Sequence, residues 1–220
     1  MLTRALRAAA LAATLLVHPS TARADWSFGV FLGASHTMPS TLTLNLPAAG
    51  THDTFSAVPL ASRSFSSPPY YGYRLGWFGS GSRRIGVEAE LIHLKIYAGD
   101  GALGPLVQRF SISHGLNLLL VNLVVRQPMQ RRVWLAARGG AGMAIPHGES
   151  RVGGIDQEQY EIASAAFQAA AGPEFALSRH ARGFVEYKVT TTAPSVSVAN
   201  GTVRGRYTSH HLAAGLGIVW

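Results

Sequence analysis

Apolar and polar residues alternate along most of this chain, in segments that are separated by turns rich in Gly, Pro and Ser. Side chains of a β-strand point alternately to the two faces of its sheet, so each segment predicts a strand with one apolar face. In the first segment, Trp26, Phe28 and Leu32 alternate with small or polar residues. Eight such strands are predicted, at residues 25–35, 70–78, 83–97, 109–126, 133–149, 158–177, 182–192 and 203–220.

The sixth segment, residues 158–177, is rich in Ala, a composition that also suits a helix. Gly172 and Pro173 interrupt such a helix and strands surround the segment, so a strand is the favoured interpretation. The connections between the strands are alternately long and short. The long connections are residues 36–69, 98–108, 148–157 and 193–201, and the short ones are 79–82, 127–130 and 178–181. Within the first long connection, residues 51–63 show a local hairpin pattern.

An even number of strands, with short turns at one end and long loops at the other, is typical of a bacterial outer-membrane barrel. The last strand agrees, because Leu212, Leu216 and Ile218 form an apolar row that ends in the aromatic Trp220. A terminal aromatic residue in this phase resembles the assembly signal of such barrels. A soluble barrel would place its apolar row inside. We therefore predict an all-β fold, an eight-stranded antiparallel transmembrane β-barrel of the outer-membrane type.

Residues 1–24 predict a secretory signal peptide, with a basic start, an apolar run and the cleavage site Ala22-Arg23-Ala24. The barrel domain then spans residues 25–220, and we expect it in the bacterial cell outer membrane. Beyond the signal, no apolar run reaches the roughly 18 residues that a membrane helix needs. Without the three arginines of the signal, the formal net charge of +8 falls to about +5 and is spread along the chain. Nucleic acid is therefore not an expected partner.

The faces opposite the apolar rows predict the residues of the barrel interior. They are Arg74, Glu88, Glu90, Asn117, Arg138, Ser164, Gln168, Glu174, Glu186, Lys188, Tyr207 and His211. Acidic and basic side chains are mixed in this set, so we expect them to pair, as buried charges do. Eight strands leave an interior that side chains fill, so neither an open pore nor transport is expected.

Five polar residues interrupt the lipid-facing rows of the third, fourth and fifth strands, close to the end with the long loops. They are His93, Lys95, His114, His147 and Glu149. Neighbouring strands are about 4.8 Å apart, so these side chains are predicted to converge on the outward face at the outer rim. The alternative is that they simply leave the hydrocarbon and meet polar headgroups.

The position of His114 depends on the phase of the fourth strand. The even positions of that strand, including Leu116, Leu118 and Leu120, are assigned to the lipid face, and His114 continues their row. His210 has the same lipid-facing parity on the last strand, where it lies away from the other five residues.

Imidazole and carboxylate groups in one place predict a divalent metal site formed by His93, His114, His147 and Glu149, in which Lys95 would hold a phosphate. An adjacent Ser113 raises the alternative of a hydrolase that uses a Ser-His pair. Neighbouring residues of a strand face opposite sides, however, so Ser113 and His114 could act together only at a bulge. The Gly-rich run at residues 139–142 lacks the Lys-Ser/Thr ending of a phosphate loop and is assigned to close packing.

Motifs in most of residues 68–220 resemble those of a known family, the lipid A oxidases of rhizobial type, which are outer-membrane barrels. The shared runs, in order and with similar spacing, are Pro68-Pro69-Tyr70-Tyr71-Gly72, His93-Leu94-Lys95-Ile96-Tyr97-Ala98 with Asp100, Gly115-Leu116-Asn117-Leu118-Leu119 with Val121-Asn122, Gly140-Ala141-Gly142, Ile145-Pro146-His147 with Glu149, Gln159-Tyr160-Glu161 and Glu186-Tyr187-Lys188. His114 departs from the pattern, because some members have an acid there.

The resemblance implies oxidation of the proximal glucosamine of lipid A to an aminogluconate, with molecular oxygen as co-substrate and a divalent cation as cofactor. Lipid A, as part of lipopolysaccharide, and the outer membrane are then the expected partners, and we expect a monomer. Two alternatives remain. One is a lipid A deacylase, and the other is a non-enzymatic surface barrel that binds a partner through its loops, chiefly residues 36–69.

Overall fold

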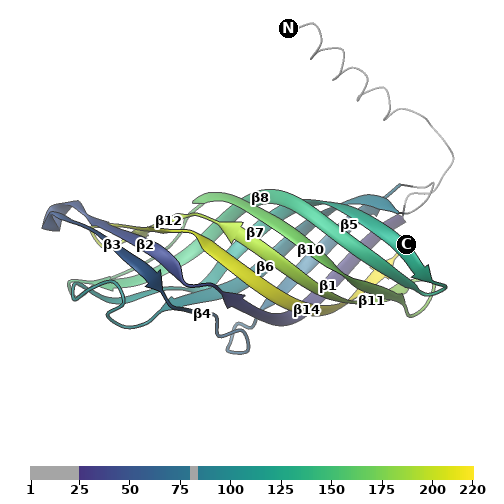
Figure 1. Cartoon of the computed structure of the whole chain (residues 1–220), viewed down its shortest axis with the longest axis horizontal. Coiled ribbons are helices and arrows are strands. Elements are labelled where there is room, and N and C mark those ends of the chain that lie inside the picture. The colour runs from purple at the N-terminus through teal and green to yellow at the C-terminus, as the bar shows by residue number, and fades with distance from the viewer. Residues whose placement is uncertain (1–24, 80–83) are drawn as a thin grey trace, which may run out of the picture.

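Eight strands form a closed antiparallel ring (Figure 1), as the alternating pattern predicts. The computed structural model describes residues 25–79 and 84–220, so the predicted signal peptide and most of the turn at 79–82 lie outside the described residues. The ring follows the chain and closes where its last strand, β14, pairs with its first, β1. Its strands are β1 (Asp25–Thr37), β5 (Tyr71–Phe78), β6 (Ile85–Ala98), β7 (Val107–Gln130), β8 (Val133–Val152), β10 (Ser164–Ala176), β11 (Ala181–Thr192) and β14 (Tyr207–Val219).

An apolar belt covers the outward face of the ring. The exposed side chains that form it include Trp26, Phe28, Val30, Leu32, Tyr73, Leu75, Trp77, Ile85, Val87, Leu119, Val121, Leu123, Leu135, Met143, Phe167, Val185, Tyr187, Leu212, Leu216 and Ile218. So large an exposed apolar surface suits lipid rather than water. Closure of the ring leaves no unpaired strand edge at the height of this belt, as a hydrocarbon environment requires. Across the described residues no helix has the length and apolar character of a membrane span.

The predicted phase of β7 is wrong. Leu116, Leu118 and Leu120 face the interior and are buried, whereas Leu119 and Val121 are exposed in the belt. The segment is apolar at nearly every position, so its own periodicity does not define a face. Pairing with β6 and β8 decides the phase, and it turns Asn122 inward to donate a hydrogen bond of 2.9 Å to Glu90.

The interior of the barrel holds the predicted network of paired charges. Arg74 contacts Glu90 at 3.1 Å and also reaches Glu186, and Arg138 contacts Glu88 at 3.1 Å. Gln168 and Lys188 both donate to Glu90. Asn117 was predicted to face the interior but lies on the outer side, where it contacts His93. The error follows from the reversed phase of β7.

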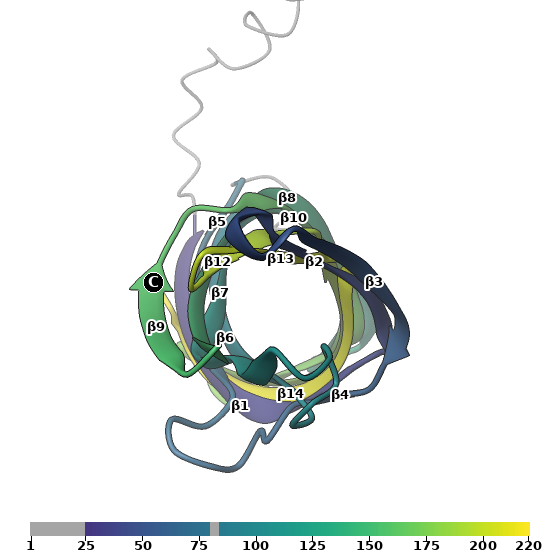
Figure 2. The same ribbon diagram turned by 90° about the vertical axis from the view of Figure 1, so that its left-hand side faces the viewer.

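The long connections contain more secondary structure than the sequence indicated. Residues 36–69 form β2 (Ser40–Leu46), the short helix η1 (Pro47–Ala49), β3 (Thr51–Val58) and β4 (Leu60–Ala61). Residues 193–205 contribute β12 (Ser195–Val198) and β13 (Gly201–Gly205), and a second sheet in the order β12-β13-β2-β3 stands at the outer end of the barrel (Figure 2). Leu42, Leu44 and Val203 of this sheet are buried, so the interior is apolar at this end.

The predicted sixth strand is divided into two. β9 (Ile155–Tyr160) pairs with β8 as a hairpin, and the ring strand β10 begins only at Ser164. The predicted turn at residues 127–130 is also part of β7, which continues to Gln130. Both differences follow from backbone pairing with a neighbouring strand, which extends strands beyond the limits of their apolar pattern.

We expect the charge network to determine the stability of the barrel. Arg138→Met would leave Glu88, Glu174 and Glu186 with one cation fewer, and breaking a buried pair of this kind costs about 3–5 kcal/mol. Urea unfolding in detergent micelles measures the free energy of unfolding.

The matched control is Arg151→Met, because Arg151 makes an ion pair of 3.9 Å with Asp156 and both side chains are more than half exposed. Its loss should cost about 1 kcal/mol or less. Equal losses in the two variants would contradict a structural role for the interior network.

Candidate functional site

The five polar residues predicted from the broken rows lie on the outward side of β6, β7 and β8, just above the belt. In β6 the outward row passes from Val87 and Leu91 to His93 and Lys95, and in β8 it passes from Met143 to His147 and Glu149. The outward phases of these two strands are therefore as predicted. His93, Lys95 and His147 are nevertheless buried, because other segments cover them from outside the barrel.

A break in the β7–β8 ladder turns His114 outward. The pairing is interrupted between Ser111 and Leu116, and Gly115 has a φ of +124°. A Cβ atom on Gly115 would lie 2.3 Å from Cε1 of His93, so only glycine fits this backbone beside the imidazole. His114 therefore faces outward although Leu116, two residues later, faces inward.

The same break brings Ser113 and His114 to one acceptor. Ser113 Oγ donates to Oε1 of Glu149, and Nδ1 of His114 contacts the same oxygen. The bulge that a joint role of these neighbours requires is therefore present. Burial alone would raise the pKa of the Glu149 carboxyl, but hydrogen bonds from Ser113 and His114 outweigh burial and hold the pKa below its ordinary value. Glu149 is thus a carboxylate at neutral pH.

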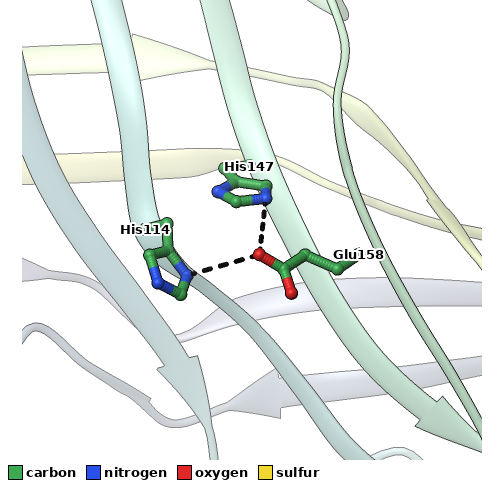
Figure 3. A group of neighbouring side chains, drawn as sticks. All are labelled: His114, His147 and Glu158. Atoms are coloured by element: carbon green, nitrogen blue, oxygen red, sulfur yellow. Dashed lines mark ion pairs between the residues drawn. The ribbon is translucent and has the colours of Figure 1, made fainter.

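His114, His147 and Glu158 form a cluster whose ligand atoms all lie within 4.8 Å of one another (Figure 3). Nε2 of His147 is 3.0 Å from Oε1 of Glu158, and Nδ1 of His114 is 3.8 Å from the same oxygen. Two imidazoles and a carboxylate are a common ligand set for divalent zinc and similar ions. The donor atoms present therefore fit a divalent cation.

Glu158 was not predicted as a site residue. It lies on β9, which was predicted as part of a membrane strand, and the hairpin brings it back over β8 opposite Glu149. The neighbouring Tyr160 stacks on His147 with ring centroids 3.8 Å apart and covers it. The nearest signal in the sequence was the run Gln159-Tyr160-Glu161, which follows Glu158 directly.

His93 lies beside this cluster rather than in it. Its ring stacks on Tyr71 at 4.7 Å, and its Nδ1 is 2.9 Å from Oδ1 of Asn117. The amide of Asn117 donates to the carbonyl of Ile145, so its oxygen faces His93 and accepts from Nδ1–H. The lone pair of His93 is then on Nε2, a buried atom that has no partner among the described residues.

Lys95 binds the backbone of a neighbouring segment. Its Nζ donates to the carbonyls of Ser66 and Ser67, at 3.0 Å and 2.9 Å. An ammonium group has three N–H donors, so one donor and the positive charge remain for an anion. His210 is not part of the group, since it lies on β14 and bonds the hydroxyl of Tyr187.

The closed ring, its apolar belt and its charged interior define the chain as an outer-membrane β-barrel. No family model matches the sequence, and no curated protein matches it. The fold is similar to that of Neisserial surface protein A (NspA), at 11% identity and a TM-score of 0.43, over 89% of this chain and 98% of that one. It is also similar to Ail of Yersinia pestis, at 11% identity and a TM-score of 0.44, over 90% and 99%.

A third similar structure is the outer membrane protein AlkL, with 14% identity and a TM-score of 0.49, over 93% of each chain. None of these proteins bears on the resemblance to lipid A oxidases, which therefore stays a prediction.

We expect the cluster to bind a divalent cation, and Zn²⁺ is a suitable probe. Glu158→Gln and His147→Ala should each lower the affinity for the cation by about tenfold or more. Mutation of a residue that only hydrogen-bonds a metal ligand already causes a loss of this size. Isothermal titration of the protein in detergent measures the affinity, and His210→Ala, a histidine of similar parity on another strand, should leave it unchanged.

The same titration separates the two carboxylates. If Glu149 mainly orients His114, Glu149→Gln lowers the affinity less than Glu158→Gln does. A larger loss for Glu149→Gln would make Glu149 the ligand, as the sequence predicted.

Proposed function

We propose that this barrel is a lipid A-modifying enzyme that oxidises the proximal glucosamine to an aminogluconate at the outward site. One observation carries the proposal, namely the group of histidines and carboxylates on the lipid-facing side of the barrel, directly above the belt. Polar groups on a lipid-facing surface are costly, and in membrane proteins such groups mark functional sites. A lipid that is anchored in the outer leaflet presents its sugar at this height.

Access from the side supports a membrane lipid as the substrate. Charged side chains fill the barrel at mid-height, and buried apolar side chains, including the leucines of the outer sheet, pack together at the outer end. On the outward face, His114 and Glu158 are exposed to molecules of the leaflet. His93 and His147 are buried, each beneath an aromatic ring.

The reaction breaks the C1–H bond and the O–H bond of the C1 hydroxyl, which removes two electrons and two protons and leaves a lactone carbonyl at C1. Molecular oxygen accepts the two electrons and the two protons and leaves as hydrogen peroxide. Water then opens the lactone to the acid. The carboxylate of Glu149 and the free Nε2 of His93 are the groups suited to accept the hydroxyl proton. A divalent cation held by His114, His147 and Glu158, with Glu149 and His93 beside them, would act as a Lewis acid toward a substrate oxygen.

Lys95 would attract a phosphate of the lipid with its remaining donor. Burial lowers the pKa of the Lys95 ammonium, and the nearby positive charge of Arg63 lowers it further. Two cations on this side of the site favour an anion there.

Acyl-ester hydrolysis is the second candidate, and a specific observation favours it. Ser113, His114 and Glu149 meet at one carboxylate oxygen, and a nucleophilic serine needs a nearby histidine that an acid orients. Both contacts go to Glu149, however, and no bond between Ser113 and His114 accompanies them among the described residues. Oxidation therefore remains the first candidate.

The mass of lipid A distinguishes these functions. We expect that expression of the protein in a bacterial outer membrane whose lipid A has a free hydroxyl at C1 adds one oxygen atom to lipid A, read by mass spectrometry. Loss of an acyl chain would instead support a deacylase. An unchanged mass, with a folded barrel and added divalent metal, would exclude both enzymes and favour a barrel that binds a partner through its loops.

Variants of the same chain test the residues. His147→Ala should lower the yield of oxidised lipid A by about 10²-fold or more, as expected when a positioned acid–base or ligand group is lost. Ser113→Ala should be tolerated by an oxidase and should abolish a hydrolase, while His210→Ala serves as the matched control. Full activity in His93→Ala would remove His93 from the site without changing the function.

A further inference from the structure

Between β4 and β5 the chain leaves the wall of the barrel. Ala61 pairs with Tyr97 of β6, and Tyr71 pairs with His93. The chain therefore takes ten residue steps from Ala61 to Tyr71, whereas β6 spans the same distance in four steps. The surplus forms a projecting loop, residues 62–69, which we name the side arm. Figures 1 and 2 both show it standing away from the barrel, between β4 and β5.

The side arm lies on the outward face and not over the mouth of the barrel. Lys95, in the outward row of β6, donates to the carbonyls of Ser66 and Ser67. The guanidinium of Arg63 lies 4.3 Å from the ring centroid of Tyr97, which is in the same outward row.

The base of the side arm is fixed. The amide of Tyr70 donates to the carbonyl of Ser64 at 2.7 Å, and the amide of Ser35 on β1 donates to Oγ of Ser64 at 2.9 Å. Ser64 is buried, whereas residues 65–67 are exposed. The contacts hold the tip in one place relative to the wall, so its outward position is a defined feature of the fold.

Phe65 is at the tip and is 85% exposed, more than any other large hydrophobic residue among those described. On a soluble protein, a single exposed apolar residue is an ordinary feature of the surface. Here, however, the phenyl ring projects sideways from a membrane barrel, next to a belt whose upper edge includes Tyr71 and Leu91 at the foot of the arm. An arginine two residues away adds a positive charge.

An aromatic side chain beside a basic one is the composition of segments that lie in a membrane interface. The ring enters the boundary of the acyl chains, to a depth of about 5–10 Å in interfacial helices, and the cation meets anionic headgroups. Arg63 lies at the base of the arm and Phe65 at its tip, so both groups are available to one leaflet. The side arm also leads directly into β5, whose outward side chains are part of the lipid-facing surface.

We propose that the side arm is a lateral membrane contact, in which Phe65 inserts into the outer leaflet and Arg63 binds the phosphates of its lipids. The occupant of this surface is the lipid leaflet rather than another protein. The arm thereby extends the contact of the barrel with the membrane beyond the belt. The inference is independent of the enzymatic proposal, because it needs neither a cation nor a reaction.

The chain contains no cysteine, so single nitroxide labels can be placed without other changes. Phe65→Cys would be labelled and reconstituted in vesicles of phosphatidylcholine and phosphatidylglycerol. Electron paramagnetic resonance then measures collisions of the label with oxygen, which concentrates in hydrocarbon, and with a nickel chelate, which stays in water. The ratio of the two collision rates reports the depth of the label.

Two labelled controls calibrate that ratio. Leu119→Cys marks the upper belt, and Ile155→Cys marks the exposed tip of the β8–β9 hairpin, which should remain in water. We expect the ratio at residue 65 to lie closer to that at 119 on a logarithmic scale. A ratio closer to that at 155 would overturn the proposal, and a heat-modifiable shift on gels confirms that each variant is folded.

Discussion

The ion pairs inside the barrel determine where this protein can meet another molecule. Arg74 and Arg138 each contact several carboxylates, and Lys188 donates to the same glutamate as Gln168, so the interior is filled by groups that need one another. Removal of any one of these cations would leave its carboxylates with one partner fewer in a place that water does not solvate. The candidate site lies outside the wall, where polar side chains are free of this network.

The sequence predicted the fold because alternation is strong wherever one face is polar. In β6, Glu88 and Glu90 define the interior, so the outward assignment of His93 and Lys95 follows from parity alone. β7 offers no such contrast around Leu118–Val121, and its phase depends on which neighbours it pairs with. That information belongs to the tertiary structure. The prediction for β7 was wrong for this physical reason.

The positions of the residues in the candidate site were predictable in part, and for different reasons. His147 and Glu149 were placed correctly by period, whereas His114 faces outward only because the ladder breaks before Leu116. A break of this kind is set by one backbone conformation, the positive φ of Gly115, and glycine also occurs in apolar strands where two backbones simply pack closely. Glu158 could not be assigned at all, because its position depends on a hairpin whose two strands show little apolar alternation.

The conformation of Gly115 determines how His93, Ser113 and His114 are arranged. A residue with a side chain would collide with His93, and a regular ladder would turn His114 toward the interior. With glycine, His93 packs against the backbone while Ser113 and His114 both reach Glu149. Outside this central group, the ring of Tyr160 covers His147 on one side and the side arm binds Lys95 on the other. Two segments that lengthen the chain beyond a minimal barrel thus fold back onto the same outward face. Below them the rows continue into the belt through Leu91 and Ile145, so polar groups give way to apolar ones along each strand. A molecule with a polar head and acyl chains has the same order of groups, and this match is the physical reason to look for the ligand in the leaflet.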